Sequence, residues 1–180
     1  MKDLTSSDSY FEDFQVGDRY EHPRGRTVDN YDNCIVTHLT MNTAQGHFNL
    51  DYMKGAMGGQ FPERLVMGGA TTAIVIGLTS EDMSENAFLD LAITDIRLKS
   101  PVYAGDTLYA ASEVLELCDS NERPDAGVVR YRFTGRKADG TEVVSGVRTI
   151  LVKRRACWAD RPHAAHAGAR EPAGEGHVAT

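Results

Sequence analysis

The sequence has no long hydrophobic run. None of its 180 residues belongs to a stretch that reaches the roughly 18 apolar residues needed by a membrane-spanning helix. Residues 1–10 are polar and acidic, and they lack the apolar core of about 7–15 residues that marks a secretion signal. We therefore expect a cytoplasmic protein that has no membrane as a partner.

Positive charge is also scarce. Lysine and arginine together number 19 against 26 aspartates and glutamates, which leaves a formal net charge of −7. Attraction to a phosphate backbone needs a concentrated patch of positive charge. The charge balance therefore argues against nucleic acid as a partner.

Cysteine is rare and irregularly spaced. The three cysteines are Cys34, Cys118 and Cys157, and the sequence has neither a CxxC nor an HExxH pattern. We interpret the cysteines as reduced, structural thiols, and we expect no metal site. The glycine pairs at 58–59 and 68–69 match neither a dinucleotide-binding fingerprint nor a P-loop, so the sequence implies no nucleotide cofactor.

The apolar content is sufficient for one core of ordinary size, since 41% of the residues are hydrophobic and 8% are aromatic. The apolar alternation stops after Lys153, where alanine, glycine, proline and histidine become frequent. We therefore divide the chain into a flexible N-terminus (1–9), one domain (10–155) and a flexible tail (156–180). The tail has no framework that would fix metal coordination by its three histidines, His163, His166 and His177.

Two segments of the first half have helical patterns. Residues 27–43 begin with two residues suited to a helix cap, Thr27 and Asp29, and place Ile35 and Leu39 at helical spacing. We expect this helix to run to residue 42 or 43.

The second segment, residues 65–78, is apolar on nearly all sides and stops at the polar run 79–82. Such a helix must be buried almost all round. Thr71 and Thr72 lie on it, and their hydroxyls are expected to bond back to the preceding turn.

Four strand-like segments follow the second helix. In the third of them, Tyr131 and Phe133 alternate with arginines, which predicts one apolar and one wet face. One long buried helix before an antiparallel sheet predicts an α+β fold, and a curved sheet wrapped around such a helix is the hotdog arrangement. The segments are 88–98, 107–117, 127–135 and 142–153.

The densest group of reactive side chains comprises His38, Asn42 and His47. The first two are four residues apart and would share one face of a helix. His47 joins them only if the helix ends before it, and Gly46 is suited to such an end. A histidine on an apolar face is most often a core residue whose hydrogen bonds are satisfied, so the spacing alone leaves both interpretations open.

The segment LTMNTAQGHFNLD at 39–51 resembles the motif of the MaoC-like hydratases, the family of (R)-specific enoyl-CoA hydratases, in which a histidine follows an acidic residue by five positions. The similarity continues through FEDFQVGD, LVMGGATTAIVIGL and PVYAGDTLYAASEV, and it covers about residues 10–154. The phrases MNT, GLTSEDMSENA and SNERPDAGVV are similar to the branch of that family that contains mesaconyl-CoA hydratase, also called β-methylmalyl-CoA dehydratase.

The resemblance implies a hydro-lyase that hydrates an α,β-unsaturated acyl thioester with a short or branched acyl group, or dehydrates the 3-hydroxyacyl form. His47 matches the catalytic histidine of the family. The backbone N–H of Gly68, with Gly69 beside it at the start of the buried helix, matches the donor that stabilises the developing oxyanion. The resemblance implies no cofactor beyond the thiol of coenzyme A or of an acyl carrier protein. It also implies at least a homodimer.

The sequence departs from the family motif around these residues. Asn42 replaces the acid, Ala44 and Gln45 replace Asn-Pro, and Met67 stands where the family often has histidine. Since an amide does not accept a proton, we expect His47 to be the sole base. Asn42 would then orient the water, and His38 is the reserve candidate for the base.

Two other functions remain open. A hotdog thioesterase would need a carboxylate or an activated water near the buried helix, and residues 65–80 contain no acidic residue. A non-catalytic acyl-binding protein would explain the altered motif at Asn42, Ala44 and Gln45. Arg64 and Lys99 are interpreted as ordinary solvated charges.

Overall fold

The computed structural model describes residues 9–159, apart from the side chains of residues 56 and 57. Within this range no helix is long and apolar enough to cross a membrane. In chain order the elements are η1 (Phe11–Asp13), β1 (Arg19–Thr27), α1 (Asn30–Leu39), η2 (Gln45–His47), α2 (Leu50–Gly55), η3 (Ala56–Gly59), α3 (Gly68–Leu78), α4 (Ser80–Met83), β2 (Ala87–Leu98), β3 (Thr107–Asp119), β4 (Ala126–Lys137), β5 (Glu142–Lys153) and α5 (Arg155–Trp158).

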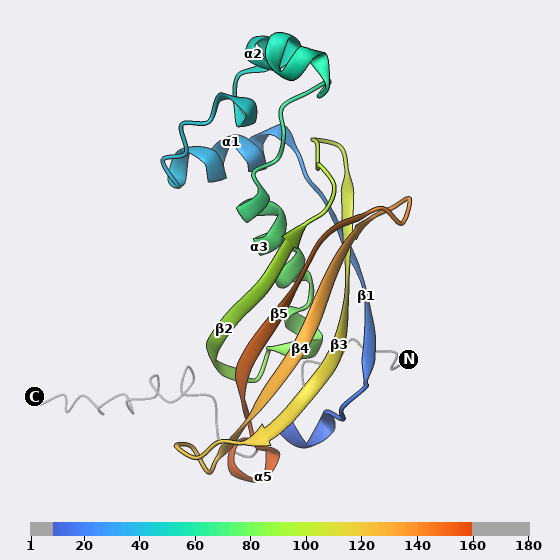
Figure 1. The fold of residues 1–180 in the computed structure, drawn as a ribbon. Helices are drawn as coiled ribbons and strands as arrows, with labels where there is room; N and C mark the ends of the chain where they lie inside the picture. The colour runs from blue at the N-terminus through green and yellow to red at the C-terminus, as the bar shows by residue number, and fades with distance from the viewer. Residues whose placement is uncertain (1–8, 160–180) are drawn as a thin grey trace, which may run out of the picture.

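One antiparallel sheet curves around α3, in the strand order β1-β3-β4-β5-β2 (Figure 1). The four predicted strands are confirmed to within one or two residues at each end. The strand β1 was not predicted, because Pro23 and Gly25 interrupt its pattern. They lie at a register shift between His22 and Arg26, a bulge at the edge of the sheet where both residue types are tolerated. The α+β hotdog prediction is therefore confirmed.

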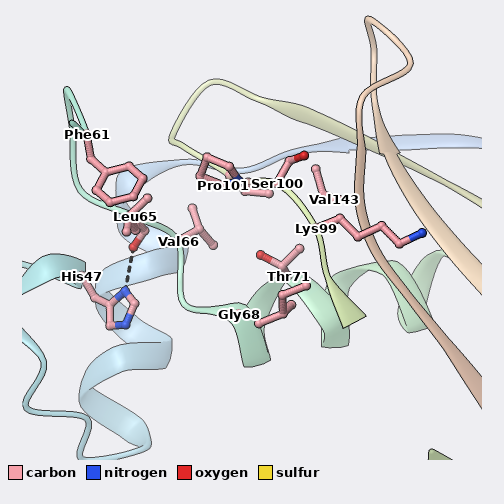
Figure 2. Close-up of a pocket in the computed structure, with 12 residues that line it drawn as sticks. His47, Phe61, Leu65, Val66, Gly68, Thr71, Lys99, Ser100, Pro101 and Val143 are labelled. Carbon is pink, nitrogen blue, oxygen red and sulfur yellow. Dashed lines mark hydrogen bonds between the residues drawn. The ribbon is translucent and has the colours of Figure 1, made fainter. Parts of the chain in front are cut away.

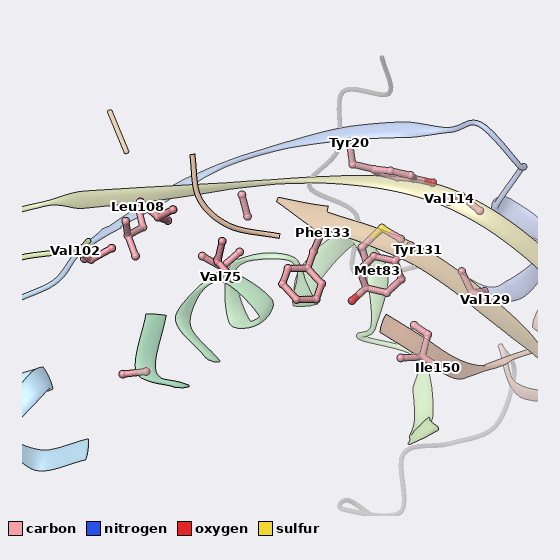
Figure 3. Packing of buried hydrophobic residues seen from close by; sticks show 14 of the residues in the cluster. Tyr20, Val75, Met83, Val102, Leu108, Val114, Val129, Tyr131, Phe133 and Ile150 are labelled. Carbon is pink, nitrogen blue, oxygen red and sulfur yellow. The ribbon is translucent and has the colours of Figure 1, made fainter. Parts of the chain in front are cut away.

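The core lies between α3 and the concave face of the sheet (Figure 3). Val75 is fully buried there and packs so closely against β4 that a Cβ atom on Gly135 would lie 2.4 Å from its methyl group. Phe133 and Tyr131 fill the next layer along the same strand. The alternation of apolar and charged residues in β4 thus places the rings inside and the arginines outside.

The helix α3 differs from its prediction in two ways. It begins at Gly68 and not at Leu65, and the three residues before it form an extended segment. It is also not buried all round, because the small residues on one side are exposed along its length. These residues present little apolar surface to water, so the high mean hydropathy of the segment does not require their burial; they are Gly69, Ala73 and Gly77.

The helix α1 is shorter than predicted. Asp29 caps it as expected, in a reciprocal pair with Asp32. It ends at Leu39, because Met41 adopts a left-handed backbone (φ 53°) and Asn42 N–H donates to the carbonyl of Thr37. The predicted end at residue 42 or 43 is therefore three or four residues too late, and Gly46 lies in the separate turn η2.

The expected apolar face of α1 is also wrong. The buried residues of this helix are the polar Asn33 and Thr37, whereas Leu39 is 77% exposed.

The helix α3 ends at Leu78, just before the polar run, as predicted. The polar run itself was not expected to be helical, but it forms the short helix α4. There Asp82 is buried, and its Oδ2 lies 2.5 Å from Nδ1 of His22 on β1. Nε2 of the same ring lies 2.9 Å from the hydroxyl of Ser112 on β3. This chain of hydrogen bonds joins β1, α4 and β3 inside the core.

The helix α5 continues the ordered chain past the predicted domain end at 155. The Trp158 indole donates to Asp125, and its ring meets Phe88 edge-on at 4.8 Å. The hydrogen bonds from Arg123 and from this indole lower the pKa of the Asp125 carboxyl to about 2. The predicted flexible N-terminus (1–9) and the tail histidines lie almost wholly outside the described residues, so these two predictions remain open.

Candidate functional site

A pocket of about 340 Å³ opens at the start of α3 (Figure 2). Its walls come from the extended segment before α3, from the segment after β2 and from β5, and they are mostly apolar. A backbone hydrogen bond from Val66 N–H to the Val102 carbonyl joins two of these segments. The apolar wall residues are Phe61, Leu65, Val66, Leu98, Pro101, Val102 and Val143, and the side chains of His47, Thr71, Lys99 and Ser100 add polar atoms.

His47 reaches the pocket from η2. Its Nδ1 lies 2.8 Å from the carbonyl oxygen of Leu65, and because a carbonyl can only accept, Nδ1 must carry the hydrogen. In the neutral ring Nε2 is then the unprotonated nitrogen. No residue of the described chain bonds to Nε2, so its lone pair is available to a bound molecule.

Gly68 is the first residue of α3 and lines the same pocket. Its N–H is one of the unpaired donors at a helix start, and no acceptor within residues 9–159 reaches it. The Leu98 side chain packs directly on this glycine, where a Cβ atom would lie 2.3 Å from Cδ1 of Leu98. The site therefore combines a nitrogen base with a backbone donor in an apolar surrounding.

The other predicted site residues do not line this pocket. The side-chain Oδ1 of Asn42 accepts from Ala44 N–H at 2.9 Å, in the turn that follows the early end of α1. His38 is exposed, with its ring 6.2 Å from that of Phe48. Gly69 is exposed on the outer side of α3. Of the five predicted residues, the pocket brings together His47 and Gly68.

The hydroxyls of α3 bond back to the preceding turn as predicted. Thr72 donates to the Gly68 carbonyl at 2.9 Å, and Thr71 donates to the Met67 carbonyl at 3.5 Å. Lys99 is paired with Glu142 at 2.7 Å, which agrees with an ordinary surface charge.

Asn33 on α1 was missed by the sequence analysis. It is 2% exposed, and its carboxamide bonds to three backbone groups around the pocket. An asparagine within a helical segment resembles a surface residue in sequence. The sequence carried no signal for this residue, because its three partners are backbone groups.

The sequence was compared with known families and proteins. A family model described as mesaconyl-CoA hydratase matches residues 2–177. The β-methylmalyl-CoA dehydratase of Chloroflexus aurantiacus is 32% identical over 167 residues, which are 93% of this chain and 42% of that protein. The mesaconyl-CoA hydratase of Haloarcula marismortui is 31% identical over 162 residues, 84% of this chain and 44% of that protein. The chain thus spans less than half the length of these relatives.

Solved structures share the fold. A putative MaoC domain dehydratase from Chloroflexus aurantiacus is 30% identical with a TM-score of 0.74, over 82% of this chain and 45% of that one. A Mycobacterium tuberculosis protein described as a double hotdog fold has a TM-score of 0.75 at 20% identity, over 94% of this chain and 53% of that one. The second similarity supports the fold alone.

Proposed function

The chain belongs to the mesaconyl-CoA hydratase family, and on this premise we propose that it is a hydro-lyase that reversibly adds water across the α,β double bond of an acyl thioester. The observation that carries the proposal is the pocket that His47 and Gly68 both line, together with the absence of any partner for His47 Nε2 within the described chain. The relatives are named for mesaconyl-CoA and β-methylmalyl-CoA, and we propose a short or branched acyl group for this chain.

The proposed mechanism uses one base. Nε2 of His47 takes a proton from water while the water oxygen bonds to the β-carbon, and the electrons of the double bond move onto the thioester oxygen. The Gly68 N–H donates to that oxygen as its charge develops, assisted by the positive end of the α3 dipole. The imidazolium then returns the proton to the α-carbon, which restores the neutral base. Asn42 has no step in this mechanism.

The apolar walls have a role in the same proposal. Leu65, Val66 and Val102 offer a surface for a hydrocarbon chain, and an apolar surrounding strengthens the hydrogen bond to the oxyanion. The reaction consists of proton transfers and one addition, so we propose that it needs no cofactor besides the carrier thiol, on coenzyme A or on an acyl carrier protein.

An assay of the native chain with crotonyl-CoA, mesaconyl-CoA and methylmalyl-CoA tests this function. We expect the absorbance of the conjugated thioester to fall with the two unsaturated substrates and to rise with the third, while free thiol stays constant. Release of free thiol would instead identify a thioesterase. Saturable binding without any change in absorbance would identify an acyl-binding protein without catalysis.

We further propose that the chain pairs with a second copy through the edge strand β2. This strand bonds to β5 on one side and to no described strand on the other, and five of its large apolar side chains are exposed. Leu98 packs on Gly68, so the apolar surface continues from β2 to α3 and into the pocket. The exposed fractions are 57% for Leu89, 49% for Leu91, 43% for Ile93, 41% for Ile96 and 60% for Leu98.

Leu91→Lys is expected to convert the pair into single chains, because it places a charge in the centre of this surface. Light scattering should show the mass falling from twice the chain mass to the chain mass. Val16→Lys is the matched control, since Val16 is 63% exposed but precedes β1 at the opposite edge of the sheet. A native protein that is already a single chain would refute the pairing.

A further inference from the structure

We propose that Asn33 is a positioning residue that holds the base and the oxyanion donor in fixed relation to each other. This inference rests on the proposed function, since it assigns those two roles to His47 and Gly68. The Asn33 carboxamide is the only side-chain group of the described chain that bonds both to the segment of His47 and to the segment that leads into α3.

Three hydrogen bonds connect the Asn33 carboxamide to these segments. Its Nδ2 donates to the carbonyl of His47 at 2.8 Å and to the carbonyl of Leu65 at 3.0 Å. Its Oδ1 accepts from the N–H of Met67 at 3.1 Å. A backbone carbonyl can only accept and a backbone N–H can only donate, so these three partners fix which end of the Asn33 amide is the nitrogen and which is the oxygen.

The Leu65 carbonyl has a double role in this arrangement. It accepts from Asn33 Nδ2 and from His47 Nδ1, so both of its lone pairs are used. The second bond selects the ring tautomer that leaves Nε2 unprotonated. Asn33 therefore acts on His47 in two ways. It bonds to the backbone carbonyl of His47, and it bonds to the Leu65 carbonyl that accepts from the His47 ring.

The bond to Met67 acts on the oxyanion donor. Met67 is the N-cap of α3 and has no side-chain cap of its own, and its N–H directly precedes that of Gly68. A fixed Met67 peptide sets the direction in which α3 starts and so the direction of the Gly68 N–H. The Asn33 carboxamide, on the helix α1 that Asp29 caps, thus connects the His47 ring with the Gly68 N–H.

A second link shows what Asn33 adds. Leu65 N–H donates to the Gly46 carbonyl at 2.9 Å, so the two segments remain joined when the carboxamide is removed. We therefore expect the loss of Asn33 to loosen the alignment of the site without dissolving the pocket. A displacement of about 1 Å at a reacting group lowers the rate by roughly 10²-fold.

Two substitutions of Asn33 test whether its hydrogen bonds position the site. Asn33→Leu has a similar shape and removes all three bonds, whereas Asn33→Asp keeps an acceptor for Met67 N–H but places a carboxylate oxygen against two carbonyls. We expect kcat to fall by roughly 10²-fold in both, with little change in KM. Thr37→Val is the control, because Thr37 lies one turn further on α1, is 0% exposed and has an unpartnered hydroxyl within residues 9–159. This control should fold and keep the native kcat.

A readout that needs no turnover distinguishes this inference from the proposed function. ¹⁵N NMR of the histidine rings reports which nitrogen carries the hydrogen, and the His47 signal among six histidines is assigned by its loss in His47→Gln. We expect the Nδ1–H form in the native chain and in Thr37→Val, and an increased share of the Nε2–H form in Asn33→Leu and Asn33→Asp.

Native kcat and an unchanged tautomer in folded Asn33 variants would overturn the inference. Failure of both variants to fold, while Thr37→Val folds, would also count against it, since Asn33 would then serve general stability. If the native chain hydrates no thioester but the Asn33 variants show the tautomer shift, the proposed function is refuted, while the orientation of the His47 ring by Asn33 still stands.

Discussion

Replacing His47 with glutamine is expected to lower kcat for hydration by about 10²–10⁴-fold, the contribution that a positioned acid–base group typically makes. The glutamine amide is still able to donate to the Leu65 carbonyl, which accepts from Nδ1 of the native ring at 2.8 Å. It has no nitrogen that takes up a proton near neutral pH. The substitution therefore removes the base and preserves the contact that positions it.

Initial rates for the native chain, His47→Gln and His38→Gln are the measurement. The same substitution at His38 is a matched control, because His38 is exposed and lies outside the pocket. We expect His38→Gln to retain the native kcat. If kcat falls only in His38→Gln, His38 and not His47 is the base. If all three proteins have equal rates, neither histidine takes part in the reaction.

The second large effect concerns stability. Asp82→Ala is expected to lower the free energy of unfolding by about 1–3 kcal/mol, the cost of leaving a buried hydrogen-bond donor without its acceptor. Asp82 and His22 are each 3% exposed, and their bond joins α4 to β1. Without the carboxylate, Nδ1 of His22 faces a cavity in the core with no acceptor, while its other nitrogen remains held by Ser112.

Urea unfolding of the native chain, Asp82→Ala and Glu81→Ala compares this buried pair with an exposed one on the same short helix. Glu81 pairs with Arg24, whose side chain is 71% exposed, at 2.8 Å. Because exposed pairs contribute little, Glu81→Ala should lower the free energy of unfolding by no more than about 1 kcal/mol. Similar losses in the two variants would show that the Asp82 bond contributes no more than a surface contact.

Much of the fold was predictable because it depends on local repetition. The strands β3 and β4 alternate buried and more exposed residues at a period that the sequence displays directly. The strand β1 lacks this signal, since Pro23 and Gly25 mark a bulge whose pairing with β3 is a long-range contact. The apolar run at 65–67 was assigned to a helix because apolar runs do not distinguish a buried helix from a buried extended segment.

Two of the residues that line the pocket were predictable from the sequence. His47 and Gly68 match residues of the family pattern and line the pocket, whereas Asn42 matches the same pattern but bonds to Ala44 N–H in the turn after the left-handed Met41. The contacts of Asn33 are with peptide groups, which every residue possesses, so no pattern of partner residues marks them in the sequence. Its function depends on three segments meeting at one point.

In the pair proposed above, the bulge in β1 would limit how large the assembly grows. Pro23 has no backbone N–H to offer, and Arg24 and Arg26 place charge along this outer edge of the sheet. Two copies joined through β2 would carry a β1 strand at each outer end, and neither end is suited to accept a further strand. Pairing through the same strand in both copies forms a closed twofold unit, so the sheet can double its width once without becoming the start of a fibre.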